Sequence, residues 1–299
     1  MASKDEKGRG LVRRLTDFAR SSISHKQVVA AMYWRRFVSD GPVPIRLPFG
    51  AWWLARHSAL DSSLMGGTFE PDILRFAERY LVPGMSVLDI GAHHGLYSLL
   101  AAKQVGRSGR VVAFEPSPRE RKRLEENIRL NFFRNITIES FALGPEASEA
   151  KLYQVSGAED YCNSLRPPAG KPIERNVQVK VTSLDEFLSG QTQTKFDFVK
   201  IDTEGAELGI LQGAVKFLTT HPRPTLLCEV AEIRTSNWGY HAAEIVTLLR
   251  DREFEWFAVV ADGSLTRLDA NQDLSDANLV AIPSEAVNET LRRVNATDR

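Results

Sequence analysis

The chain has 299 residues, of which 43% are hydrophobic and 25% are charged. This composition is typical of a globular protein and excludes extensive disorder, a collagen-like repeat and a coiled coil. The longest apolar run, Val28–Trp34, is far shorter than the roughly 20 residues of a membrane span, and the first residues lack the apolar stretch of a secretory signal. Two cysteines cannot build a disulfide framework or a four-ligand zinc site. We therefore expect a cytoplasmic protein in a reducing compartment.

The net charge of zero hides an asymmetry between the first 40 residues and the rest. Residues 1–40 hold nine Lys/Arg and four Asp/Glu, so the remainder holds 29 of the 38 basic and 34 of the 38 acidic residues. A neutral-to-acidic body disfavours nucleic-acid binding, which requires clustered cations. Leu11, Leu15 and Phe18 recur at helical spacing in the basic arm. A solvated helix, a dimer contact or a frayed tail explains this arm better than an anionic membrane surface.

We expect an N-terminal extension over residues 1–66 that is basic and partly helical, a catalytic domain over 67–285 and a tail over 286–299. In the domain, short apolar runs alternate with amphipathic stretches, and helices are expected near 96–105, 118–131, 205–219 and 241–251. The expected strands are Ser86–Ile90, Arg110–Phe114, Ile136–Phe141, Phe196–Ile201, Pro224–Val230, Phe254–Val260 and Asn278–Ile282. Strand–helix alternation predicts parallel strands joined by right-handed crossovers, and hence a doubly wound α/β sheet.

Two local patterns refine this prediction. Ser117, Pro118 and Glu120 combine an N-cap serine, a proline in the first helical turn and a glutamate placed for a capping box. Glu149–Val155 and Val177–Val181 look extended and flank a polar loop over residues 157–175. Loops of this length are usually functional or disordered.

The first strand runs into a glycine loop, Val87-Leu-Asp-Ile-Gly-Ala-His-His-Gly95. A dinucleotide site requires G-x-G-x-x-G, and His93 occupies the position where the middle glycine lets the backbone approach the pyrophosphate. Asp89, at the end of the strand, would repel a phosphate. Both features disfavour a nicotinamide dinucleotide and suit a cationic ligand without phosphate, such as S-adenosylmethionine.

A second acid, Glu115, ends the next strand, 24 residues after Gly91. In folds of this type a carboxylate at about this distance meets the ribose hydroxyls. The ordered set Asp89, Gly91, Gly95 and Glu115 therefore predicts a cofactor site. The alternative is that the glycines make plain turns and that the acids partner a helix dipole or solvent.

Three segments together resemble the FkbM family of S-adenosylmethionine-dependent methyltransferases: Asp89–Gly95, Ala113–Ser117 and above all Val199-Lys-Ile-Asp-Thr-Glu-Gly-Ala-Glu-Leu208. Gly67–Pro71 and Leu226–Val230 also match, so the resemblance covers residues 66–283. It implies a class I, Rossmann-like sheet of seven strands with an antiparallel last strand. The family more often has Gly-Ala-Asn in the glycine loop, which puts the contacts of His93 in doubt.

The resemblance also implies roles for individual residues. Glu115 would hold the ribose, residues 140–142 would border the adenine, and Glu70 would close over the methionine ammonium. The implied cofactor-binding set is Glu70, Asp89, Gly91, His93, Gly95, Glu115, Ala142 and Asp202. The place of the Asn/Asp-Pro-Pro-Tyr/Phe segment of nucleobase methyltransferases holds Asp202-Thr-Glu-Gly here, which disfavours base methylation.

Methyl transfer requires alignment of nucleophile, carbon and sulfur, and a neutral hydroxyl also needs a base. Asp202 follows the strand Phe196–Ile201, beside the expected methyl donor, and is our first candidate. Glu204 and His94 are further candidates for the base. Glu204 could instead only partner the helix dipole, and His94 could instead be a loop histidine bonded to a carbonyl. We expect no metal, with a divalent ion on Asp202, Glu204 and Glu229 as the alternative.

We interpret the chain as an S-adenosylmethionine-dependent methyltransferase that methylates a hydroxyl of a small molecule, saccharide or polyketide. N-methylation of a peptide side-chain amide and a non-catalytic cofactor-binding module stay open as alternatives. The acceptor is expected near the loop 157–175 and the segment Arg234–His241, where Trp238, Tyr240 and His241 would either stack on it or pack within the loop. A homo-oligomer also stays open.

Overall fold

The computed structural model describes residues 41–56, 58–156, 162–269 and 274–296. The chain divides into two compact units, Met1–Phe69 and Glu70–Arg299. The amphipathic pattern expected around residues 11–20 lies outside the described residues. Across the described part of the chain, no helix combines the length and the apolar character that crossing a membrane demands.

The described part of the first unit is a hairpin followed by a helix. Strands β1 (Val43–Arg46) and β2 (Trp52–Ala55) pair antiparallel, and α3 (Ala59–Gly66) follows. The Trp53 indole donates to Asp61 Oδ1 over 2.7 Å, and Asp61 forms a capping box with Ser58. Within the extension that was expected to be partly helical, the described residues thus form a hairpin over Val43–Ala55 and a helix over Ala59–Gly66. Gly50, at a φ of +83°, makes the reversal that allows the two short runs to pair.

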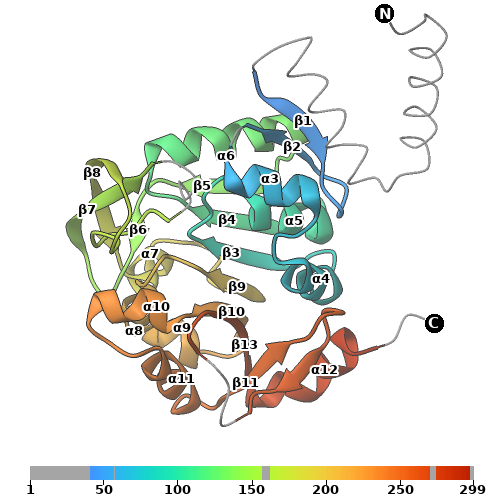
Figure 1. Ribbon diagram of the computed structural model, residues 1–299. Helices are drawn as coiled ribbons and strands as arrows, with labels where there is room; N and C mark the ends of the chain where they lie inside the picture. Colours follow the sequence, from blue (N-terminus) through green and yellow to red (C-terminus); the bar gives the residue numbers. More distant parts are fainter. Residues whose placement is uncertain (1–40, 57, 157–161, 270–273, 297–299) are drawn as a thin grey trace, which may run out of the picture. The chain divides into compact units, whose positions relative to one another are not determined.

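The second unit is built on an eight-stranded sheet in the order β12-β11-β13-β10-β9-β3-β4-β5. Figure 1 labels its strands from β11 to β5. Its strands are β3 (Ser86–Ile90), β4 (Arg110–Phe114), β5 (Ile136–Glu139), β9 (Phe198–Ile201), β10 (Thr225–Val230), β11 (Phe254–Val259), β12 (Leu265–Arg267) and β13 (Ala277–Pro283). All seven expected strands form, and β13 is antiparallel to both neighbours as expected. The short edge strand β12 was not foreseen; a turn at Gly263 folds it back on β11.

Helices lie between the strands of the second unit. They are α4 (Pro71–Tyr80), α5 (Leu96–Val105), α6 (Pro118–Asn131), α7 (Leu184–Ser189), α8 (Glu207–Gln212), α9 (Val215–Thr219), α10 (Glu232–Thr235), α11 (Ala242–Arg250) and α12 (Val287–Val294), with 3-10 turns η2 (Ser236–Trp238) and η3 (Ser284–Ala286). One apolar cluster joins the sheet to α7, α8, α9 and α11. Leu124 of α6 packs with Ala113 and Ala92 in a second cluster. The sheet is therefore doubly wound.

One helix prediction needs correction, and the tail contains a further helix. The helix expected over 205–219 is interrupted, because the backbone of Gly213 lies against Gly144 and the Asp185 carboxylate caps α9 by accepting from the N–H groups of Lys216 and Phe217. The expected tail contains α12, which packs on α4; there Arg79 donates to the carbonyl of Val294. The amphipathic run that follows the last strand explains this packing.

A separate three-stranded sheet interrupts the alternation. It has the order β6-β8-β7, with β6 (Ala142–Leu143), β7 (Ser148–Val155) and β8 (Ile173–Thr182). The two extended segments expected from the sequence are β7 and β8, and they pair antiparallel. Residues 157–161 of the intervening loop lie outside the described residues.

Gly91 allows two strand ends to meet. Its φ is +86°, and a Cβ at this position would lie 1.9 Å from the carbonyl oxygen of Asp202. The amide of Asp202 in turn donates to the carbonyl of Ile90 over 3.1 Å. Gly95 is also closely packed, because a Cβ at this position would lie 2.3 Å from Leu124 Cδ1. Packing against backbone therefore requires a glycine at position 91, whereas at position 95 the neighbour is a side-chain methyl group.

Gly91→Ala should lower the free energy of unfolding by about 3 kcal/mol or more, because the collision with backbone adds to the positive-φ strain. Gly239 is a matched control: its φ is +84° and a Cβ there would meet nothing within 4 Å. Gly239→Ala should cost only the strain of about 1–2 kcal/mol. Urea unfolding of both variants measures the difference. An equal loss of unfolding free energy in the two variants would contradict the close packing of β3 against β9.

Candidate active site

The charged groups at the carboxyl ends of β3 and β9 surround one buried lysine. Lys200 is the register partner of Asp89 and is 3% exposed. Its ammonium lies 2.6 Å from Asp202 Oδ2 and 4.4 Å from the centre of the Tyr97 ring. The sequence placed Asp89 and Asp202 at neighbouring strand ends, and the structure brings them together at this ammonium.

Glu70 joins the same group from the start of α4. The Tyr97 hydroxyl donates to Glu70 Oε2 over 2.5 Å, and Asn278 Nδ2 donates to Oε1 over 3.0 Å. Asp89 Oδ2 accepts from the Ser98 hydroxyl over 2.5 Å. We refer to Glu70, Asp89, Lys200 and Asp202 as the Lys200 cluster.

Burial and charge act in opposite directions within the Lys200 cluster. Burial raises the pKa of Glu70 and of Asp89, and Lys200 opposes that rise in both. Burial alone would lower the pKa of Lys200, but Asp202, Glu70 and Asp89 raise it above its ordinary value. Three carboxyl groups thus share one ammonium, which leaves the cluster able to accept a further cation.

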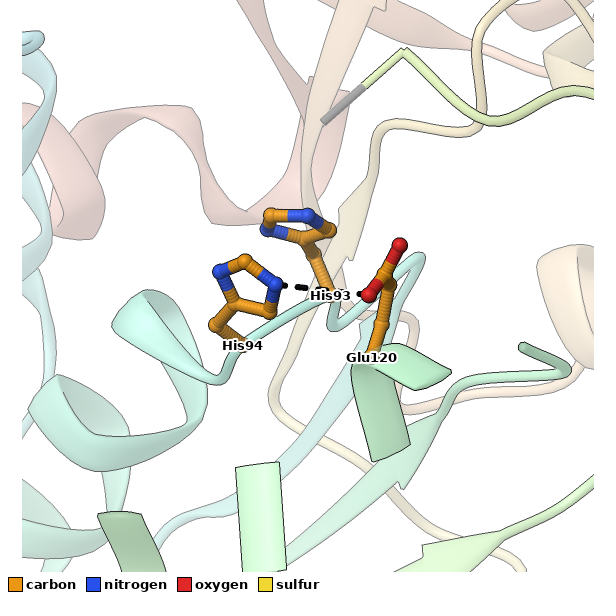
Figure 2. Close-up of side chains that lie close together, drawn as sticks. All are labelled: His93, His94 and Glu120. Carbon is orange, nitrogen blue, oxygen red and sulfur yellow. Dashed lines mark ion pairs between the residues drawn. The ribbon is translucent and has the colours of Figure 1, made fainter. Parts of the chain in front are cut away.

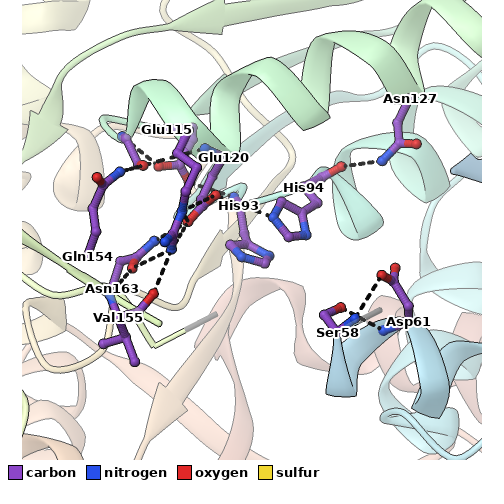
Figure 3. A network of polar contacts seen from close by, with 12 residues as sticks. Ser58, Asp61, His93, His94, Glu115, Glu120, Asn127, Gln154, Val155 and Asn163 are labelled. Carbon is purple, nitrogen blue, oxygen red and sulfur yellow. Dashed lines mark hydrogen bonds and ion pairs between the residues drawn. The ribbon is translucent and has the colours of Figure 1, made fainter. Parts of the chain in front are cut away.

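Glu115 and His93 occupy the neighbouring strand end. The two oxygens of Glu115 accept from the backbone N–H groups of His93 and Ser117, each over 2.7 Å (Figure 3). Burial raises the pKa of Glu115 to about 8. His93 adopts a φ of +51°, and its buried Nε2 has no hydrogen-bond partner among the described residues. Burial, followed by the neighbouring His94, holds the pKa of His93 well below its usual range, so the ring is neutral.

His94 faces α6. Its ring stacks on that of His93 with centroids 3.5 Å apart, and Nε2 lies 3.5 Å from Glu120 Oε2 (Figure 2). The ring is fully buried, which disfavours it as a base for an acceptor. Ser117 caps α6 as expected, but Glu120 does not complete the capping box. Its carboxylate instead accepts from Arg119 and Asn163.

Glu204 lies in the loop after β9 and not in a helix. Its φ is +59°, and Oε2 pairs with Arg234 Nε over 2.9 Å. The same nitrogen lies 3.6 Å from Glu229 Oε1. Burial raises the pKa of Glu204 to about 7, and burial together with Asp202 raises the pKa of Glu229 well above its ordinary value. Glu207 has a structural role, since its Oε1 accepts from the amide of Thr203 over 2.7 Å.

The two segments expected near the acceptor do meet at this loop. Ser164 Oγ and Trp238 Nε1 both donate to the carbonyl of Glu204, each over 3.0 Å. The Tyr240 hydroxyl donates to the carbonyl of Gly205 over 2.8 Å, and His241 is exposed and paired with Glu232. Trp238 and Tyr240 therefore hold this loop by hydrogen bonds, and stacking on an acceptor stays a prediction.

The sequence-predicted residues fall into three groups. Glu70, Asp89 and Asp202 meet at Lys200; His93 and Glu115 meet one strand away; Ala142 is buried on β6, just after β5. Sequence reasoning missed the partners Tyr97, Lys200 and Asn278. A lysine inside the apolar run Phe198–Ile201 was an available signal, whereas nothing local links Asn278 to Glu70, 208 residues away.

Comparison with known proteins agrees with this geometry. The profile of the methyltransferase FkbM domain matches residues 89–256, more than half of the chain. The chain belongs to the FkbM methyltransferase family. Its sheet order, read from β5 to β11, is that of a class I methyltransferase, so the predicted fold class is confirmed.

Three relatives illustrate the extent of the similarity. The chain is 28% identical to Methyltransferase 1 of Beauveria bassiana over 42% of this chain and 57% of that protein. It is 28% identical to the AMB antimetabolite synthetase AmbE of Pseudomonas aeruginosa over 58% of this chain and 10% of that protein. A crystal structure of methyltransferase FkbM from Methylobacillus flagellatus superposes with a TM-score of 0.44 at 18% identity, covering 75% of this chain and 53% of that one. The chain thus spans slightly more than half of the length of two of these relatives and a tenth of the third.

Glu115 predicts how stability depends on pH. In the unfolded chain Glu115 loses its proton near pH 4.5, whereas in the folded protein it keeps this proton until about pH 8. Folding therefore takes up a proton between these values, and this contribution to stability is lost as the pH rises. The melting temperature should fall between pH 6 and pH 8, and Glu115→Gln should flatten the fall. Glu146→Gln, at an exposed position, is the control; an unchanged slope in Glu115→Gln would refute the assignment.

Proposed function

We propose that this chain is an S-adenosylmethionine-dependent methyltransferase that methylates a hydroxyl group of a small molecule, saccharide or polyketide. The observation that carries the proposal is the Lys200 cluster, in which three carboxyl groups share one buried ammonium. A cationic ligand without phosphate suits this excess of acid, whereas a pyrophosphate would be repelled. S-adenosylmethionine, when bound, supplies a methyl group activated by its sulfonium.

The residues present fit this cofactor. Glu70, Asp89 and Asp202 would accept hydrogen bonds from its amino group, and Glu115 would accept from the ribose hydroxyls. The Nε2 of His93, which has no hydrogen-bond partner in the described part of the chain, offers a further hydrogen-bonding atom at the glycine loop. The remaining predicted contacts come from Gly91 and Gly95 in the loop and from Ala142 beside the adenine.

Asp202 is the residue that we propose to position and deprotonate the acceptor hydroxyl. Lys200 fixes its Oδ2, while the side chain is 29% exposed. A carboxylate held in one orientation can position a hydroxyl and take its proton as the new bond to carbon forms. Glu204, with a pKa of about 7, is the second candidate base, because a base is most effective when its pKa lies near the working pH.

A small-molecule acceptor gains support from one relative. AmbE is by its name an antimetabolite synthetase. The rival N-methylation of a peptide amide would be recognised by a peptide product that is one methylene heavier. A non-catalytic module would bind the cofactor and methylate no acceptor.

Cofactor binding tests the charge argument directly. Calorimetry should show that the wild-type chain binds S-adenosylmethionine and that Asp89→Asn weakens the affinity at least about tenfold, equivalent to about 1.4 kcal/mol. Asparagine preserves the size of the side chain and an acceptor for Ser98 but removes the charge. Asp251→Asn, at an exposed position after α11, should bind like the wild type. Folded protein without affinity for the cofactor would refute the proposal.

Asp202→Asn tests the acceptor role. We expect kcat to fall by roughly 10²-fold or more, as is typical when a general base is lost. The affinity for S-adenosylmethionine should weaken by a smaller factor, because Glu70 and Asp89 remain. Release of S-adenosylhomocysteine, followed across a panel of hydroxylated acceptors, measures kcat. A variant with unchanged kcat would remove Asp202 from the chemistry.

A further inference from the structure

Three carboxylates converge beside the Lys200 cluster. Asp202 directly follows β9, Glu229 lies near the end of β10, and Glu204 lies in the loop between β9 and α8. One oxygen from each lies within 4.8 Å of the others. The register explains the meeting: Leu227 pairs with Lys200, so Glu229, two residues further along, comes beside Asp202.

A second observation points to a missing partner. Glu229 is 8% exposed, and its Oε2 is buried without a hydrogen-bond partner among the described residues. The amide Oδ1 of Asn278, the residue that faces Glu229 across β10 and β13, is likewise buried without a partner there. Leaving a buried polar oxygen unpaired is destabilising, and more so when the oxygen is charged. Unpaired oxygens on facing residues therefore indicate a ligand that both could contact.

Arg234 does not supply that partner. Its Nε lies 2.9 Å from Glu204 Oε2 and 3.6 Å from Glu229 Oε1, yet it is aligned for a hydrogen bond to neither. Lys200 is committed to Asp202. Three carboxylates therefore meet with incomplete compensation in a largely buried place.

We propose that Asp202, Glu204 and Glu229 bind one hard divalent cation, such as Mg²⁺ or Mn²⁺, at the carboxyl ends of β9 and β10. Carboxylate and amide oxygens are the ligands that these ions prefer, whereas zinc and copper favour imidazole and thiolate. Mg²⁺ takes six ligands, so three protein carboxylates leave positions for other oxygens. If the proposed function holds, these positions suit the acceptor hydroxyl, which a metal ion orients and polarises.

Mn²⁺ binding to the full-length chain, measured by the electron paramagnetic resonance of free Mn²⁺ without cofactor or acceptor, tests the site. We expect one ion per chain, and we expect Glu229→Gln to weaken its affinity at least about tenfold. Glutamine is isosteric and removes an uncompensated charge, so this variant should fold; circular dichroism checks that it does. Glu204→Gln tests a second ligand of the same site and should also weaken the affinity for Mn²⁺.

Glu125→Gln, on the exposed face of α6, is the matched control and should bind Mn²⁺ like the wild type. Absence of binding by folded wild-type protein up to about 1 mM Mn²⁺, the weak end of protein sites for divalent ions, would overturn the proposal. Equal affinity in the wild type and in both glutamine variants would overturn it as well. Because S-adenosylmethionine is absent from this experiment, failure here leaves the proposed function standing, and its failure is detected separately by calorimetry.

Discussion

The buried ammonium of Lys200 is the constraint on which the arrangement of this sheet edge depends. An ammonium removed from water is stable only beside compensating charge. Asp202 supplies it at 2.6 Å, and the face of the Tyr97 ring covers it from the side of α5. Because Tyr97 also binds Glu70, the charge of one strand residue organises the start of α4 and the ends of β3 and β9 together.

Close backbone packing keeps these charges in place. The carbonyl of Asp202 occupies the space that a side chain at Gly91 would fill, and the Trp238 ring lies where a Cβ at Gly205 would be. Glu207 accepts from the amides of Thr203 and Gly205, which fixes the loop that carries Glu204. The acidic side chains thus stand on backbone with little freedom to rearrange, as electrostatic preorganisation requires.

The same sheet edge has two electrically different parts. At β3 and β4, Glu115 binds backbone N–H groups, and the neutral His93 presents a nitrogen that has no partner among the residues the structure describes. At β9 and β10, carboxylates gather around Lys200 and Arg234. A cofactor with hydroxyls at one end and a positive charge at the other suits both parts.

The sequence by itself determined which segments of the domain form strands and helices along the chain, and the position of its acids. Apolar runs of strand length, amphipathic stretches between them and the acids at their ends are local patterns, because burial and periodicity act over a few residues. Local signals also found the cap of α6 at Ser117. They failed where a distant contact prevailed: Asp185 and Gly144 interrupt the helix expected over 205–219.

Only the tertiary structure decided which partner each acid has. Glu120 turned from its own helix cap to Arg119 and Asn163, and Glu70 met Asn278 from the far end of the chain. Such pairs depend on the register of strands and on the packing of helices, which no local pattern encodes. The sequence therefore showed where charge would gather, and the fold chose which charges would touch, because electrostatic partners are selected by distance in space and not by separation along the chain.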